Sequence, residues 1–146
     1  MKNIFFASLV LVFIMQACCT KKMCESGLYQ VTLEGFEPSE LDTIIMRSYD
    51  KNSNFTSLID SSIVSASQSD SITWVLYPGS QLDINQDYQF QFSGLPQVYT
   101  LTDFQVGKQG CNTCFPFRPK SDYYDALEGY SVNGVRKANE GLRISK

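Results

Sequence analysis

The sequence predicts an all-β protein, namely an antiparallel, immunoglobulin-like β-sandwich of roughly seven or eight short strands. Three observations support this prediction. Several short stretches alternate between apolar and polar residues, as strands with one buried face do. Turn residues separate these stretches at spacings of roughly 10 to 20 residues. Aromatic residues, which favour strands, make up 13% of the 146-residue chain, and no long apolar helical pattern is present.

The clearest strand patterns lie at residues 27–34, 71–77 and 87–92. Each stretch alternates, so its apolar side chains should share one buried face. The core residues predicted from these strands are Tyr29, Val31, Leu33, Ile72, Trp74, Leu76, Tyr88, Phe90 and Phe92. Residues 41–49 carry apolar groups on both faces, which predicts a central strand.

The middle of the chain is less regular. Residues 61–71 contain six serines, which predicts an exposed loop with a short strand around Ile63. Between Val98 and Val106 the apolar residues change phase, which a regular strand does not allow. We therefore expect a bulge or bend near Thr102-Asp103.

The last forty residues combine irregular and regular patterns. Residues 107–125 predict a long irregular segment, with a single helical turn over 121–127 that Ser or Asp caps. Asn133-Gly134 is a strong hairpin signal. Residues 142–144 predict a last edge strand.

An apolar stretch at the N-terminus predicts export. Lys2 is followed by an apolar run from Ile4 to Met15. At about 12 residues this run is too short for a transmembrane helix, which needs roughly 20. It ends in Met15-Gln16-Ala17-Cys18, with a small residue before the predicted cleavage site. This ending resembles the lipobox of bacterial lipoproteins, in which the cysteine receives lipid and becomes the mature N-terminus.

The resemblance implies a three-part chain. Residues 1–17 are the signal peptide, Cys18 is the lipid attachment site followed by a tether through residue 26, and 27–146 form a single β-sandwich domain. Lipobox, size and strand pattern together resemble the small surface lipoproteins of Bacteroidota, many of which have no assigned function. This resemblance covers the whole chain, but it implies location and fold class only. The expected location is the cell envelope, in the outer membrane of a Gram-negative bacterium, with the membrane bound through the lipid.

Two tripeptides, Asp42-Thr43-Ile44 and Asp70-Ser71-Ile72, resemble the Asp-Ser/Thr-aliphatic sites that Bacteroidota O-glycosylate. Aspartates are common in this chain, so chance matches are expected. The second tripeptide adjoins a predicted loop and is the better candidate.

Composition limits the functions that the chain can have. It holds 12 basic and 15 acidic residues, and loss of residues 1–17 removes one basic residue, Lys2, so the net charge falls from −3 to −4. Nucleic acid is therefore not an expected partner. The chain has no histidine, which is the commonest general base and a common metal ligand. We expect no enzyme activity, no cofactor and no metal.

Two runs rich in Asp and Asn predict turns. Residues 50–54 and 83–87 alternate Asp or Asn with other residues, as the opening of a calcium loop does. Neither run has the glycine and glutamate that complete such a loop, so we interpret both as turns in which the side chains bond to the backbone.

Cys111-Asn112-Thr113-Cys114 is the most specific chemical feature of the exported part. A redox pair needs a helix N-terminus, and residues 115–119 form helices poorly. A zinc site would need Cys19 and Cys24 as further ligands. In an oxidising envelope a structural disulfide is favoured. We expect Cys111–Cys114, with Cys24 as the alternative partner of either cysteine.

The long segment 107–130 is the predicted functional face. It carries Phe117, Arg118, Tyr123 and Tyr124, which can bind a glycan or a peptide if they are exposed. The alternative is that these rings close one end of the core. The sequence thus predicts a non-catalytic envelope lipoprotein with a binding or structural role. The other candidates are a carbohydrate- or peptide-binding module that uses residues 115–130 and, more remotely, a thiol-based redox protein.

Overall fold

The structure, a computed structural model, describes residues 19–20, 28–111, 113–114, 122–138 and 141–146. The chain divides into two compact units, one made of Ser26–Gly107 with Ala126–Lys146 and the other of Met1–Glu25 with Lys108–Asp125. In chain order the elements are β1 (Cys19–Thr20), β2 (Val31–Glu34), the 3-10 helix η1 (Pro38–Glu40), β3 (Ile44–Asp50), β4 (Leu58–Gln68), β5 (Thr73–Tyr77), β6 (Gln86–Phe92), β7 (Val98–Cys111), β8 (Thr113–Cys114), β9 (Asp122–Val132), β10 (Val135–Ala138) and β11 (Arg143–Ser145).

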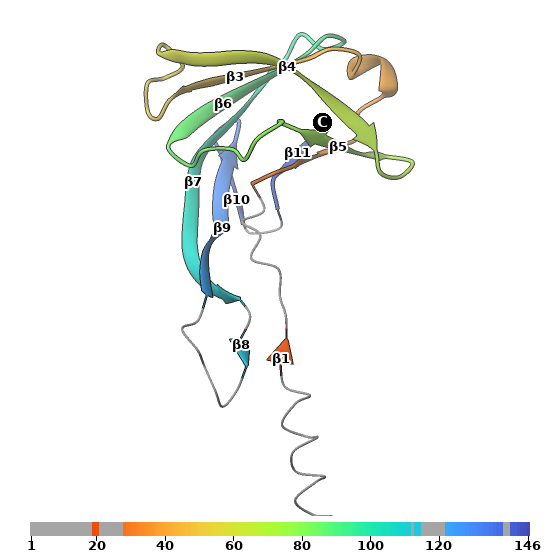
Figure 1. The fold of residues 1–146 in the computed structure, drawn as a ribbon. Helices are drawn as coiled ribbons and strands as arrows, with labels where there is room; N and C mark the ends of the chain where they lie inside the picture. The colour runs from red at the N-terminus through yellow and green to blue at the C-terminus, as the bar shows by residue number, and fades with distance from the viewer. Residues whose placement is uncertain (1–18, 21–27, 112, 115–121, 139–140) are drawn as a thin grey trace, which may run out of the picture. The chain divides into compact units, whose positions relative to one another are not determined.

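The prediction of an all-β fold is confirmed. One curled sheet of nine strands has the order β10-β9-β7-β6-β3-β4-β5-β2-β11 (Figure 1). The sheet is mixed rather than wholly antiparallel, because β11 runs parallel to β2. Within the described part of the chain, no helix has the length and hydropathy that a membrane crossing requires.

Strand β4 joins the two halves of the sheet. Its first part pairs with β3, from Leu58 to Val64, and its last part pairs with β5, from Ser65 to Gln68. The predicted loop is therefore wrong for residues 61–68, where the expected short strand around Ile63 is part of a longer one, but most of these side chains are exposed as predicted. Backbone pairing with neighbours on one side and then the other outweighs the weak strand preference of its serines.

One hydrophobic cluster fills the curl of the sheet. It includes Val31, Leu33, Leu76, Tyr88, Phe90 and Phe92, six of the nine predicted core residues. Trp74 is only half-buried and packs against this cluster.

Two predicted core residues are exposed instead, because each lies just outside its strand. Tyr29 precedes β2 and is 55% exposed, while its neighbour Leu28 is buried. Ile72 precedes β5 and is 69% exposed. The N–H of Ile72 donates to Asp70 Oδ1 at 3.0 Å, so Ile72 belongs to a turn that Asp70 closes.

Three local predictions agree with the structure. Strand β3 lies between β6 and β4, as a central strand. At the expected bend, Asp103 has φ +55°, and both Leu101 and Phe104 are buried although three positions separate them. Strand β11 forms one edge of the sheet.

The predicted irregular segment at 107–125 is regular over much of its length. Residues 107–111 continue β7, and the expected helical turn at 121–127 is wrong because Asp122–Val132 is strand β9. Strands β7 and β9 are neighbours in the sheet, and the carboxylate of Glu128 in β9 lies over Gly107 of β7. Pairing between strands thus outweighs a single cap signal, which by itself nucleates a helix poorly.

Candidate functional site

The predicted binding residues of segment 115–130 are only partly described. Two of the four candidates, Phe117 and Arg118, lie outside the described residues. The same is true of the predicted lipid attachment site, Cys18, and of Cys24. Tyr123 is 62% exposed. Tyr124 is half-buried, and its hydroxyl donates to Gln109 Oε1 at 3.2 Å. The described part of this segment therefore shows one exposed ring and one ring that is held against β7.

The cysteines lie in the smaller unit. Cys111 is buried and disulfide-bonded. In the short β1/β8 pair, the backbone register places Cys19 opposite Cys114. Which cysteine bonds Cys111 stays a prediction.

The acidic runs form turns. Asp83 Oδ1 accepts the backbone N–H of Asn85 at 2.8 Å. Asp50 Oδ2 accepts the hydroxyl of Ser57, and Asp87 Oδ2 accepts the N–H of Asn52 at 2.9 Å. The described residues contain no group of three or more Cys, Asp or Glu that could hold a metal ion.

The two O-glycosylation candidates differ in access. Thr43 is half-buried just before β3, and its N–H donates to Ser93 Oγ at 3.2 Å. Ser71 is exposed in the turn before β5. Modification at either site stays a prediction.

A cleft of ≈ 240 Å³ lies where the two ends of the sheet come together. We call it the basic cleft; its lining residues are Tyr130, Arg136, Lys137, Ala138, Arg143 and Ser145. Tyr130 comes from β9, the next three from β10 and the last two from β11. The two edge strands of the sheet therefore share one cleft.

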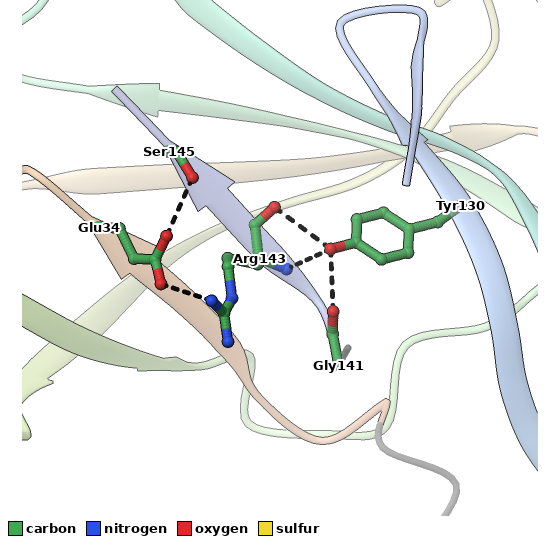
Figure 2. A network of polar contacts seen from close by, with 5 residues as sticks. All are labelled: Glu34, Tyr130, Gly141, Arg143 and Ser145. Atoms are coloured by element: carbon green, nitrogen blue, oxygen red, sulfur yellow. Dashed lines mark hydrogen bonds and ion pairs between the residues drawn. The ribbon is translucent and has the colours of Figure 1, made fainter. Parts of the chain in front are cut away.

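Tyr130 connects these two ends (Figure 2). Its ring is 1% exposed. Its hydroxyl donates to the carbonyl of Gly141 at 2.8 Å and accepts the N–H of Arg143 at 2.7 Å. A hydroxyl can do both at once. This one side chain thus occupies backbone groups that β11 presents at its open edge.

Glu34 of β2 holds the side chains on the next part of β11. Its Oε1 lies 2.8 Å from Arg143 Nη1, and its Oε2 accepts the hydroxyl of Ser145 at 3.1 Å (Figure 2). The buried Nε of Arg143 has no hydrogen-bond partner among the described residues. Arg143 is therefore oriented by Glu34 but retains unused donor capacity.

Strand β10 supplies two further cations to the cleft. Arg136 donates to Gln105 Oε1 of β7. Lys137 is exposed and forms no ion pair with any described residue. The lining residues thus include three cations and no carboxylate, and Glu34 balances only one of these charges.

Sequence reasoning missed this cleft. Four of the 12 basic residues lie in the last eleven positions, at Arg136, Lys137, Arg143 and Lys146. That enrichment in an acidic chain was the available signal. It does not show that β10 and β11 occupy opposite ends of a curled sheet, because this depends on contacts between distant strands. No protein-family model, curated protein or solved structure matches this chain.

Proposed function

We propose that this protein is a non-catalytic, lipid-anchored component of the cell envelope that binds an anionic segment of a partner protein in the basic cleft. The observation that carries the binding role is the gathering of Arg136, Lys137 and Arg143 around one cleft of a chain with net charge −3. The anchor rests on the resemblance of residues 15–18 to a lipobox, and the outer-membrane location rests on the resemblance to small Bacteroidota surface lipoproteins.

The charge of the cleft favours a carboxylate ligand. Cations that line one concavity attract anions and raise their local concentration there. Guanidinium and ammonium groups form strong charge-assisted hydrogen bonds with carboxylates. Of the three, Lys137 has no ionic partner among the described residues, and it is therefore the residue most available to a ligand.

We also propose that the curled sheet works as a two-layer, immunoglobulin-like sandwich. The support is the single core that side chains from both halves of the sheet share, with Leu33 and Ile144 from one half and Phe90 and Leu101 from the other. The long strand β4, which pairs into both halves, would then form a corner of the sandwich.

Binding of a small diacid tests the cleft. The probe is a blocked dipeptide of two glutamates, and its neutral control is the same dipeptide with two glutamines. Both are titrated by NMR into the full lipidated chain in detergent micelles. We expect the acidic dipeptide alone to shift the signals of Lys137 and its neighbours, with an affinity that falls as salt rises.

Two charge-matched variants give the control. Lys137→Gln should weaken binding of the acidic dipeptide about threefold to fivefold, the size expected for one partly solvated charge. Lys51→Gln removes the same charge outside the cleft, where Lys51 donates to the carbonyl of Ile84, and should leave binding unchanged. Equal loss in both variants, or no binding, would show that the cleft is not an anion site.

A second candidate is a carbohydrate- or peptide-binding module built on residues 115–130. The exposure of Tyr123 favours it. Its test is a glycan array with the wild-type protein and Tyr123→Ala, which should abolish any signal due to this ring. The redox alternative receives less support, because the disulfide-bonded Cys111 is only 1% exposed, and thiol exchange needs access.

A further inference from the structure

We infer that the ligand of the basic cleft is an extended acidic segment of a partner protein, which adds to β10 as a further strand of the sheet. This inference rests on the proposed function and deepens it, because it names the form of the ligand and the backbone groups that hold it.

The two strand edges that face the cleft differ in whether their backbone groups already form hydrogen bonds. Strands β10 and β11 are the ends of the nine-stranded sheet, so among the described residues each has one side without a neighbouring strand. On β11, the N–H of Arg143 already bonds to the hydroxyl of Tyr130. An incoming strand would have to displace that bond. The edge of β11 is therefore partly closed by the protein itself.

The edge of β10 is open within the part of the chain that the structure describes. Asn133 and Gly134 have φ +49° and +77°, as in a two-residue hairpin of type I′, and Val132 lies opposite Val135. In such a hairpin the residues that flank the turn exchange backbone hydrogen bonds, and the next pair does not. The N–H and C=O groups of Arg136 and Ala138 therefore point away from β9. All four residues of β10 are exposed.

The side chains of β10 define what the added strand carries. Val135 and Lys137 lie opposite Val132 and Tyr130 and so share their face of the sheet, while Arg136 lies on the other face. An added strand would present one acidic residue beside Arg136, an adjacent one beside Lys137, and an apolar residue beside Val135. The partner segment that complements β10 therefore has two consecutive acidic residues within a strand-forming sequence.

A second copy of this chain fits the same edge less well. Pairing β10 with its own copy would place two Arg136 and two Lys137 side chains close together, which is unfavourable. Lysine on an edge strand also discourages unwanted pairing in general. An acidic strand reverses that effect, because the same cations then attract it.

The test uses a hexapeptide that reads the same in both directions, so that either strand orientation gives the same pairs. The sequence is Thr-Val-Glu-Glu-Val-Thr with blocked ends. Its control has the same side chains, but its four central backbone nitrogens carry methyl groups, so it keeps the charge and loses its donors. Both peptides are titrated into the full lipidated chain in detergent micelles, and chemical shifts of β10 are followed. We expect the methylated peptide to bind about tenfold more weakly, as for the loss of two backbone hydrogen bonds.

A matched pair of variants tests the protein side. Ala138→Pro removes an N–H from the open edge without removing a bond to β9, and proline is tolerated on edge strands. Ala138→Val keeps that N–H and serves as the control. We expect the proline variant to bind the unmethylated hexapeptide about fivefold more weakly than the valine variant, with equal thermal stability. The methylated peptide gives an answer with the wild-type protein even if a variant unfolds.

The outcomes separate the two proposals. Strand addition is wrong if the two hexapeptides bind the wild-type protein equally, or if the proline and valine variants bind the unmethylated hexapeptide equally. Binding of the acidic dipeptide would then still support the anion site. Failure of the unmethylated hexapeptide to bind at millimolar concentration also overturns strand addition. If the acidic dipeptide fails as well, the proposed function is wrong too.

Discussion

At the scale of single residues, Tyr130 shows how one side chain can take the place of a missing neighbour strand. It starts from β9, is buried in the core cluster, and bonds through its hydroxyl to backbone groups at the far end of the sheet order. Its ring contributes hydrophobic burial, and its hydroxyl satisfies polar groups that burial would otherwise leave unpaired. The residue therefore links the closing of the curled sheet to the shape of the basic cleft.

Tyr130→Phe should lower the free energy of unfolding by about 1–3 kcal/mol, because it leaves the Arg143 N–H and the Gly141 carbonyl without this partner. The measurement is urea unfolding followed by Trp74 fluorescence. Tyr123→Phe, at an exposed ring, is the control and should change stability by less than about 0.5 kcal/mol. Equal effects of the two substitutions would contradict the role given to the Tyr130 hydroxyl.

Glu40 and Lys146 predict a dependence of stability on pH. The hydrogen bond from Lys146 is the main cause that lowers the pKa of Glu40, and the backbone N–H of Glu37 adds to it. The same bond to Glu40 raises the pKa of Lys146. A lowered carboxyl pKa stabilises the fold above the ordinary value of 4.5, and this contribution is lost as pH falls through the lowered pKa. The raised pKa of Lys146 acts at the other end of the scale, and its contribution is lost as pH rises through that pKa.

We therefore expect Glu40→Gln to be less stable than the wild type at pH 7 and equally stable at pH 2. Urea unfolding at the two pH values measures both differences. Asp42→Asn, at an exposed carboxylate close by in the chain, is the control. A constant difference between Glu40→Gln and wild type from pH 7 to pH 2 would rule out the ionic contribution of Glu40.

At the scale of elements, the strands are not buried equally. Strand β6 contributes three buried aromatic side chains to the core, at Tyr88, Phe90 and Phe92. In strand β5 the side chain of Leu76 is fully buried, whereas that of Trp74 is only half-buried. Strand β6 thus contributes more to the hydrophobic stabilisation than β5 does, because stabilisation scales with the apolar area that is removed from water.

Phe90→Ala should cost about 3–5 kcal/mol of unfolding free energy, because the ring is fully buried and leaves a cavity. Trp74→Ala should cost less, about 1–3 kcal/mol, because part of the indole already contacts water. Urea unfolding followed by circular dichroism compares the two variants. A larger loss for Trp74→Ala than for Phe90→Ala would contradict this ranking of the strands.

The short strands β1 and β8 indicate how the cysteines pair in disulfides. Because their register places Cys19 opposite Cys114, we expect these two to bond and Cys111 to bond Cys24. This is one of the two partners that the sequence left open for Cys111. Peptide mapping by mass spectrometry without reduction measures the pairing, and Ellman's reagent should find no free thiol. A Cys111–Cys114 bond would show instead that the first sequence prediction, a disulfide between these two cysteines, is correct.

At the scale of the whole molecule, the proposed function combines an N-terminal lipid anchor with a binding surface on the sheet. The apolar run that ends in Ala17-Cys18 predicts lipidation at Cys18. A lipid anchor restricts the protein to a membrane surface, where even weak binding of a neighbouring partner is favoured by the high local concentration. An open strand edge suits such a partner, because it recognises backbone as well as charge.

Cys18→Ser should release the protein from the membrane fraction or leave it as an unprocessed precursor that lacks lipid. Fractionation with mass measurement of the N-terminus distinguishes these forms from the wild type. Cys24→Ser is the control, and it should remain lipidated and membrane-bound. Continued lipidation of the Cys18→Ser variant would overturn the lipoprotein hypothesis.

Sequence patterns alone predicted the all-β class, the position of most strands, the hairpin at Asn133-Gly134 and the bend near Asp103. These features depend on alternation and on turn chemistry, which act over a few neighbouring residues. Most predicted core residues are correct for the same reason, and the errors at Tyr29 and Ile72 arise where a strand begins, because alternation does not mark that boundary.

The remaining features depend on contacts between strands that are distant in the sequence. The serine-rich β4 and the predicted helical turn within β9 became strands because neighbours far along the chain supply their backbone partners. The basic cleft likewise exists because the sheet curls until β10 and β11 face one concavity, and Tyr130 of β9 then reaches the backbone of β11. Local patterns contain no information about such closure, since it depends on the twist and pairing summed over nine strands.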